Sequence, residues 1–251
     1  MSEVQDYLEA VTEAPTVEDL WNMHVEKMLS FGFDRLIYGF TQYMTPSSLG
    51  DPNDFYLLSN HDPEYISHFI DNGLYFNAPM LQWSRYNDGA ASWEMIRQMD
   101  APDALTVSER KVLEFNRKMH VTAGYTISFK AVSARSKGAI ALTAKRGTSQ
   151  QDVDAMWAVH GRDIILMNNV AHLKIMTMPH TGRRHLTKRQ REVLEWVGDG
   201  KTTADIAALM GLTVATIEKH LRIAREALDV DTTAQAVLKA AFQNQMFVLE
   251  A

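Results

Sequence analysis

The chain has 251 residues, a formal net charge of −6 and an apolar fraction of 46%, so it can form two domains with cores of their own. It contains no cysteine, which excludes a disulfide framework, thiolate catalysis and a cysteine-based metal site. The acidic N-terminus has no apolar signal core, and no apolar run reaches the roughly 18 residues of a membrane span. We therefore expect a cytoplasmic protein that does not enter a membrane.

Helices and strands alternate through the first three quarters of the sequence. Their hydrophobic periodicity predicts, in chain order, a helix over 16–31, strands over 35–43 and 56–58, helices over 62–72 and 108–119, strands over 124–129 and 139–144, and a long helix over 149–176. Ser108 is the expected cap of the third helix. Two or three further strands would complete an antiparallel sheet with helices on both faces. This part is predicted to be an α/β/α sandwich of the α+β class, which can hold a small apolar ligand between its layers.

Two helix breakers, Pro179 and Gly182, follow the long helix, and the periodic pattern stops around them. We therefore divide the chain into a first domain over 1–176, a linker over 177–185 and a second domain over 186–251. No internal repeat or low-complexity segment is found.

The second domain is expected to be all-α, with four short helices whose ends are marked by caps. A short glycine-containing turn joins the second and third of them, which is the helix-turn-helix pattern. The residues that mark the helix ends are Thr187 with Gln190, Gly200, Thr202 with Asp205, Gly211, Thr213, and Thr232 with Gln235.

The third of these helices has the build of a DNA recognition helix. Its apolar side chains recur at three- and four-residue steps from Val214 to Leu228, and its other face is charged. Charged and polar side chains on such a face can reach base edges and phosphates in the major groove. The predicted DNA-binding residues are Lys201, Thr202, Thr213, Thr216, Glu218, Lys219 and Arg222.

The net charge is divided unevenly between the two domains. Residues 183–251 hold 10 Lys and Arg against 9 Asp and Glu, whereas residues 1–182 hold 15 against 22. A balance near zero is weak for a DNA-binding domain, because phosphate contacts supply much of the affinity. We therefore expect a homodimer in which two copies share one inverted-repeat site on double-stranded DNA.

The second domain resembles the LuxR-type DNA-binding domain. The resemblance depends on Leu186-Thr187-x-Arg189, Glu192-Val193-Leu194-x-Trp196, Gly200-Lys201-Thr202, Ile206-Ala207, Thr216-Ile217-x-x-His220, Leu228-x-Val230 and Ala236-Val237. The sequence departs from the family at Gln190, where Glu is usual and the capping role is kept. It also departs at Thr233, where Arg is usual and where we expect a salt bridge or phosphate contact to be lost.

The first domain resembles the autoinducer-binding domain of the acyl-homoserine-lactone quorum-sensing receptors. In that family two aromatic residues stand four apart, an Asp-Pro follows, and a Trp comes fourteen residues after the Pro. Tyr65, Phe69, Ala78-Pro79 and Trp93 stand at those steps, and Gly124 fits the family's Gly before a strand. The resemblance implies a sensor and dimerisation domain.

The side chains that would contact a lactone differ from those of the family. The resemblance implies that Tyr65 replaces a Trp, Phe69 a Tyr, Ala78 an Asp and Ala141 a Ser or Thr, while His61 stands where Tyr is common. A hydrogen bond to a charged group contributes about 1.5–3 kcal/mol, so common acyl-homoserine lactones are expected to bind poorly and the effector to be more apolar or aromatic. The predicted ligand-binding residues are His61, Tyr65, Phe69, Ala78, Trp93, Tyr38, Met80 and Ala141, and the predicted cavity walls add Leu36, Phe40, Met95, Tyr125 and Ile127.

These features predict a quorum-sensing transcription regulator of the LuxR type that is controlled by a small ligand, with RNA polymerase as a further partner. The alternative is a ligand-independent regulator whose sandwich serves dimerisation or protein–protein control. A cavity of several hundred cubic ångströms would favour the first, and a filled core the second. An enzyme is not predicted, because the sequence has no nucleophile elbow, phosphate loop or metal signature, and no cofactor or metal is expected. The acidic pair and lysine of phosphorylated response regulators are also missing.

Overall fold

The computed structural model describes residues 3–45, 47–99, 105–131, 133–179 and 184–247. The chain forms two compact units, of which the first ends at Met176 and the second begins at Thr177. Residues 180–183 of the predicted linker lie outside the described residues. In the part of the chain that is described, no helix combines the length and the hydropathy of a membrane span.

Among the described residues, an antiparallel sheet of five strands forms the centre of the first unit, in the order β2-β1-β5-β4-β3. Its strands are β1 (Phe33–Thr41), β2 (Tyr56–Ser59), β3 (Gly89–Ser92), β4 (Gly124–Ser128) and β5 (Lys137–Ala144). Four of them correspond to predicted strands, and β3 completes one edge. The Gly-Ala-Ala-Ser sequence of β3 has none of the β-branched or aromatic side chains by which a strand is recognised.

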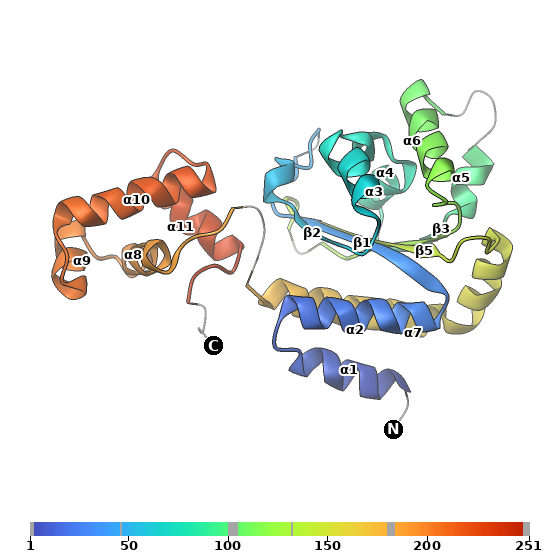
Figure 1. The fold of residues 1–251 in the computed structure, drawn as a ribbon, viewed down its shortest axis with the longest axis horizontal. Helices are drawn as coiled ribbons and strands as arrows, with labels where there is room; N and C mark the ends of the chain where they lie inside the picture. Colours follow the sequence, from blue (N-terminus) through green and yellow to red (C-terminus); the bar gives the residue numbers. More distant parts are fainter. Residues whose placement is uncertain (1–2, 46, 100–104, 132, 180–183, 248–251) are drawn as a thin grey trace. The chain divides into compact units, whose positions relative to one another are not determined.

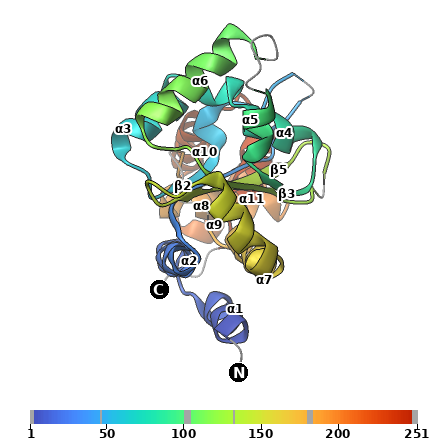
Figure 2. The ribbon, with the colours of Figure 1, turned by 90° about the vertical axis from the view of Figure 1, so that its right-hand side faces the viewer.

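Helices cover both sides of this sheet, and the two views of the ribbon agree on the layers (Figure 1, Figure 2). One side holds α1 (Glu3–Glu13), α2 (Val17–Ser30) and α7 (Gln150–Thr177). The other side holds α3 (Pro63–Ile66), α4 (Pro79–Tyr86), α5 (Glu94–Met99) and α6 (Val107–Lys118), with 3-10 turns at Pro52–Asp54 and Leu74–Asn77. The predicted α/β/α sandwich of the α+β class is confirmed.

Local capping explains where several of these helices begin. The Thr16 hydroxyl accepts a hydrogen bond from the Asp19 amide at 3.1 Å at the start of α2. The predicted cap of α6 was wrong by two residues, because Thr106 rather than Ser108 begins the helix. The Thr106 hydroxyl accepts from the Glu109 amide at 3.2 Å, and the Glu109 carboxylate accepts from the Thr106 amide at 2.7 Å. This reciprocal pair is a capping box.

The predicted helix over 62–72 is interrupted after one turn. Only Pro63–Ile66 is α-helical, and a π-helix follows over Ser67–Asp71, in which the Asn72 amide donates to the Ser67 carbonyl at 3.1 Å. A π turn adds one residue to the helical repeat and is frequent at functional sites. Here it contains Phe69 and Ile70, which border the cavity described below.

A buried hydrogen-bond network joins α1, α2 and α7. The Tyr7 hydroxyl lies 2.5 Å from His24 Nδ1, and His24 Nε2 lies 3.0 Å from Asn168 Oδ1. Asn168 Nδ2 donates to the Ile164 carbonyl at 2.8 Å, which leaves Oδ1 as an acceptor. His24 therefore carries its proton on Nε2 and accepts from Tyr7 at Nδ1. Burial lowers the pKa of His24 to about 4, so this histidine is neutral near pH 7.

The second unit is helical, as predicted. Its helices are α8 (Lys188–Gly198), α9 (Thr203–Met210), α10 (Val214–Leu228) and α11 (Thr233–Phe242). The residue before each helix is one of the predicted caps: Thr187, Thr202, Thr213 and Thr232. One apolar stripe from each helix forms a common core, which includes Val193, Leu194, Ile206, Ile217, Leu221, Leu228, Ala236 and Ala240.

Candidate functional site: an apolar cavity and a helix-turn-helix surface

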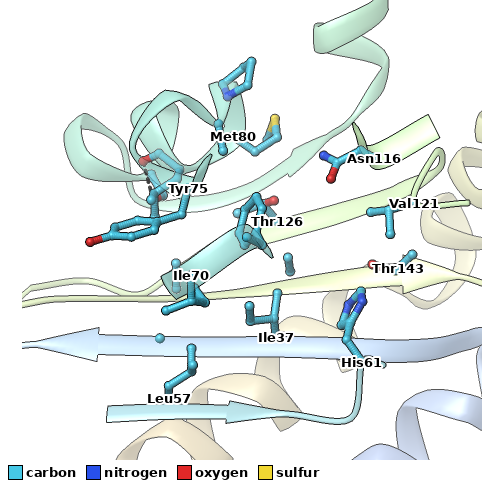
Figure 3. Close-up of a pocket in the computed structure, with 18 of the residues that line it drawn as sticks. Ile37, Leu57, His61, Ile70, Tyr75, Met80, Asn116, Val121, Thr126 and Thr143 are labelled. Carbon is cyan, nitrogen blue, oxygen red and sulfur yellow. Dashed lines mark hydrogen bonds between the residues drawn. The ribbon is translucent and has the colours of Figure 1, made fainter. Parts of the chain in front are cut away.

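A cavity of about 410 Å³ lies in the first unit, between the sheet and the helices of the α3–α6 side (Figure 3). Its lining comes from strands β1, β2, β4 and β5 and from the facing helices. Pockets for small molecules typically measure about 300–1,000 Å³ and are mostly apolar. Among the described residues that line the cavity, none is Asp or Glu.

Most of the predicted ligand-binding residues lie in this lining. They are His61, Tyr65, Phe69, Ala78, Met80, Trp93 and Ala141, and of the further predicted wall residues Phe40 also borders the cavity. The three positions at which the sequence departs most from lactone-binding chemistry, Phe69, Ala78 and Ala141, therefore present apolar side chains to the same space.

The predicted orientation of Tyr38 was wrong. Its side chain is fully buried on the other face of the sheet, where its hydroxyl lies 2.8 Å from His172 Nδ1 of α7. Successive side chains of a strand point to opposite faces, so Ile37 and Gly39 line the cavity instead. The ring of Phe40 packs 5.8 Å from His172, so this residue borders the cavity without presenting its ring to it.

The same exchange of faces occurs on β4 and affects the predicted wall residues Tyr125 and Ile127. Thr126 lines the cavity, whereas Tyr125 stacks on Trp157 of α7 at 3.8 Å. The cavity lining likewise omits Leu36, Met95 and Ile127. Met95 packs instead against the neighbouring cluster of Tyr65, Met80, Trp93 and Val121.

A column of aromatic rings forms one wall of the cavity. His61 stacks on Tyr65 at 4.4 Å, and Tyr65 stacks on Phe69 at 5.2 Å. The Tyr65 hydroxyl donates to Asn116 Oδ1 at 3.1 Å, and burial raises the pKa of Tyr65, so the phenol remains protonated. The hydroxyl predicted to meet a ligand thus already has a partner within the protein.

Trp93 is held in place by its own hydrogen bond and by a glycine. Its indole Nε1 donates to the Thr126 hydroxyl at 2.9 Å. A Cβ at Gly124 would collide with the Leu142 carbonyl and lie 3.0 Å from the Trp93 ring. Glycine at position 124 therefore permits the close approach of this ring to β4.

The buried polar atoms in the lining that have no hydrogen-bond partner among the described residues include His61 Nε2, Thr143 Oγ1 and Tyr75 Oη. Burial and then the charge of Arg35 lower the pKa of His61 to about 4, so its ring is neutral near pH 7. Thr143, Tyr75 and Asn116 were not among the predicted ligand-binding residues. Thr143 could have been predicted from Ala141. Side chains two residues apart in a strand lie on the same face of the sheet, so Thr143 of β5 faces the cavity together with Ala141.

The helix-turn-helix consists of α9, a turn at Gly211 and α10. Gly211 has a φ of 65°, the left-handed conformation that glycine adopts most readily at a helix end. The Thr213 hydroxyl accepts from the Thr216 amide at 3.2 Å and so begins α10. Thr202 begins α9 in the same way, with the exposed Lys201 before it.

One face of α10 is charged and exposed. Glu218, Lys219 and Arg222 all lie on it, and Arg222 pairs with Glu226 at 2.6 Å. At Thr233, where the family usually has Arg, the hydroxyl accepts a hydrogen bond from Arg225 at 3.0 Å. Of the seven predicted DNA-binding residues, four thus lie on α10, Thr213 lies directly before it, and Lys201 and Thr202 precede α9.

Comparison with known families identifies both units. The autoinducer binding domain family matches residues 16–175, and the luxR family of bacterial regulatory proteins matches residues 184–240. The transcriptional activator AnoR of Acinetobacter nosocomialis is 24% identical over 248 residues, which cover 94% of this chain and 95% of AnoR. The transcriptional activator LuxR of Aliivibrio fischeri is 21% identical over 191 residues, which cover 75% of this chain and 74% of LuxR.

Solved structures share the fold. SdiA in complex with octanoyl-rac-glycerol aligns with a TM-score of 0.53 at 16% identity, covering 96% of this chain and 93% of SdiA. CepR2 of Burkholderia cenocepacia, described as an N-acylhomoserine lactone-dependent LuxR family transcription factor, aligns with a TM-score of 0.53 at 17% identity, covering 69% of this chain and 93% of CepR2. The matched families and relatives are transcription regulators rather than enzymes. The chain belongs to the LuxR family of bacterial regulatory proteins and is a quorum-sensing type transcription regulator, with an autoinducer-binding domain ahead of its DNA-binding domain.

Proposed function

We propose that this regulator is controlled by a small, largely apolar molecule bound in the cavity of the first unit, and that this molecule is not a standard acyl-homoserine lactone. The observation that supports ligand control is the cavity itself, about 410 Å³ in volume and lined mainly by apolar side chains. A filled core would have favoured the ligand-independent alternative.

The chemistry of the wall argues against a standard lactone. Phe69 and Ala141 offer no hydrogen-bonding group, and at position 78 an alanine methyl borders the cavity. An amide N–H buried in such a wall would lose its hydrogen bonds to water without gaining a carboxylate. A hydrogen bond to a charged group contributes about 1.5–3 kcal/mol, so the affinity for a lactone would fall by one or more orders of magnitude.

Calorimetry of the full-length protein against a panel of acyl-homoserine lactones tests this proposal. We expect weak or undetectable binding by the wild type and improved binding after the double substitution Phe69→Tyr and Ala78→Asp. Ala78 is the N-cap of α4 and makes no side-chain cap. An aspartate there can accept from the first amides of α4, so we expect the variant to fold. A submicromolar dissociation constant of the wild type for a simple lactone would mean that the substitutions do not exclude lactones.

We further propose that the protein binds inverted-repeat DNA as a homodimer, with α10 in the major groove. Apolar side chains exposed on two helices support a dimer. Val159, Leu166 and Leu173 recur every seven residues along α7, with exposures of 74%, 46% and 64%. On α11, Leu238 and Phe242 are exposed one turn apart. Because AnoR and LuxR are named transcriptional activators, we include RNA polymerase among the proposed partners.

A further inference from the structure

The polar atoms of the cavity that have no partner are separated along its length. In Figure 3, His61, Asn116, Val121 and Thr143 lie toward one end, whereas Leu57, Ile70 and Tyr75 lie toward the other. At the first end, His61 Nε2 and Thr143 Oγ1 are buried without a hydrogen-bond partner among the described residues. A buried polar atom without a partner destabilises the fold unless a bound molecule supplies one.

Arg35 connects His61 and Thr143. It is the strand partner of Thr143 across β1 and β5, and its charge contributes, after burial, to the lowered pKa of His61. The guanidinium itself is occupied, because it donates to the carbonyls of Met119, His120 and Ala144 at 3.2, 3.0 and 2.9 Å. Its Nε also donates to Asp34 Oδ1 at 3.0 Å, so Arg35 fixes this end of the cavity and its hydrogen bonds are directed to the backbone and to Asp34.

Charged ligands do not suit this cavity. The cations in the described lining are Lys137, Arg85 and Arg117. The buried Lys137 has its Nζ 2.8 Å from Asp88 Oδ1 and also donates to two backbone carbonyls. The half-buried Arg85 donates to Gln82 Oε1 at 3.2 Å, and Arg117 is exposed. The described lining contains no carboxylate that would balance a cationic ligand. A cation moved from water into such a site loses its hydration without gaining a counter-ion, and an anion would have to displace the existing partners of Lys137 and Arg85.

We propose that the effector is a neutral amphiphile whose hydroxyl group binds between His61 Nε2 and Thr143 Oγ1 and whose uncharged body extends toward Leu57, Ile70 and Tyr75. A hydroxyl can donate to one partner and accept from the other, so it suits either tautomer of the neutral His61 ring. This inference rests on the proposed ligand control and adds to it the charge and the head group of the ligand.

Three compounds of matched length test the head group on the full-length protein. Decanol, decanoate and undecane, in which a methyl group replaces the hydroxyl of decanol, compete with the neutral fluorescent probe N-phenylnaphthylamine. We expect decanol to bind at least about tenfold more tightly than decanoate. Undecane is the more apolar compound, so a cavity without a polar subsite would prefer it over decanol. We expect the wild type to prefer decanol.

Two substitutions that each remove a buried hydroxyl, one on β5 and one on β4, separate this role from a structural one. Thr143→Val removes a hydroxyl that has no partner in the unliganded protein, so we expect undiminished stability and a shift of about five- to tenfold toward undecane in the ratio of the two dissociation constants. Ser128→Ala is the control, because Ser128 lies on β4 outside the cavity lining and its buried hydroxyl donates to the Ser84 carbonyl at 2.9 Å. It should lower the stability and leave the ratio unchanged.

Different results would overturn the proposed hydroxyl subsite and the proposed ligand control. Tighter binding of decanoate than of decanol, or an unchanged ratio in Thr143→Val, overturns the hydroxyl subsite while ligand control stands. Failure of all three compounds to displace the probe also overturns the subsite. Ligand control itself fails if the protein binds its promoter equally with and without an extract of its own host.

Discussion

At the scale of single residues, the threonines of the helix-turn-helix cap its helices, whereas its charged side chains are available for DNA. Thr202 Oγ1 accepts from the Asp205 amide, and Thr213 Oγ1 accepts from the Thr216 amide, each at 3.2 Å. These hydroxyls are occupied in holding the helix starts. Recognition of bases therefore depends on side chains further along α10, of which Lys219 and Arg222 are the exposed cations.

We expect Lys219→Ala or Arg222→Ala to weaken specific DNA binding by about 1–3 kcal/mol if the residue contacts a base. Gel-shift titration on the cognate promoter and on scrambled DNA measures the change, because loss of a phosphate contact would weaken both equally. Glu226→Ala is the comparison, since it removes the 2.6 Å partner of Arg222 together with a negative charge. It should not weaken binding. Wild-type affinity of both cation variants would contradict the proposed recognition face.

At the scale of elements, the helix starts of the second unit were predictable because capping rules are local. The four caps of the second unit could be identified from a few adjacent residues each. The faces of β1 were not predictable in this way. Helices cover both sides of the sheet, so both faces of the strand are apolar and alternation does not reveal which one borders the cavity. Leu36 and Tyr38 lie on the α7 side of the strand, and Ile37 and Gly39 line the cavity.

Other elements escaped prediction for reasons of composition or context. The small residues of β3 carry no strand signal, and its pairing with β4 supplies the strand. The break between α3 and the π-helix has no glycine or proline within it to mark it. In the cavity, Thr143 matters because its buried hydroxyl has no hydrogen-bond partner among the described residues. Which groups surround a hydroxyl is known only from the folded structure, so the sequence did not show this.

The network between α1, α2 and α7 predicts a loss of stability in acid. The pKa of His24 is about 4 in the folded protein and about 6.5 when unfolded, so the unfolded chain takes up the proton first. The free energy of unfolding therefore falls as the pH decreases from 6.5 to 4, by about 2 kcal/mol between pH 7 and pH 5 for His24 alone. The pKa of His61 and of His172 is lowered in the same direction.

Urea unfolding at pH 7 and pH 5 measures this dependence. His24→Gln keeps a neutral side chain with hydrogen-bonding capacity, so its stability should change less between the two pH values than that of the wild type. His160→Gln alters an exposed histidine of α7 and should behave as the wild type does. Equal pH dependence of His24→Gln and wild type would exclude His24 as a source of the effect.

At the scale of the whole molecule, the exposed apolar row of Val159, Leu166 and Leu173 on α7 predicts a homodimer that forms through this helix. Val159→Glu combined with Leu166→Glu places two carboxylates in the proposed interface, and we expect sedimentation to show a monomer where the wild type is a dimer. Val107→Glu is the matched control, because Val107 is 72% exposed, close to the 74% of Val159, but lies at the start of α6 on the other side of the sheet. It should remain dimeric. A wild-type monomer both free and on DNA would contradict the homodimer.

The alternation of β1 has a consequence for how such a receptor diverges. One strand supplies Ile37 to the cavity and Tyr38 to the contact with His172 of α7, so ligand preference and the packing of α7 depend on different side chains of the same element. Mutations at the cavity positions can change which molecule is sensed and leave the side chains against α7 intact. The sheet separates the side chains that line the cavity from those that contact α7. The ligand specificity can therefore change while the packing against α7 stays the same.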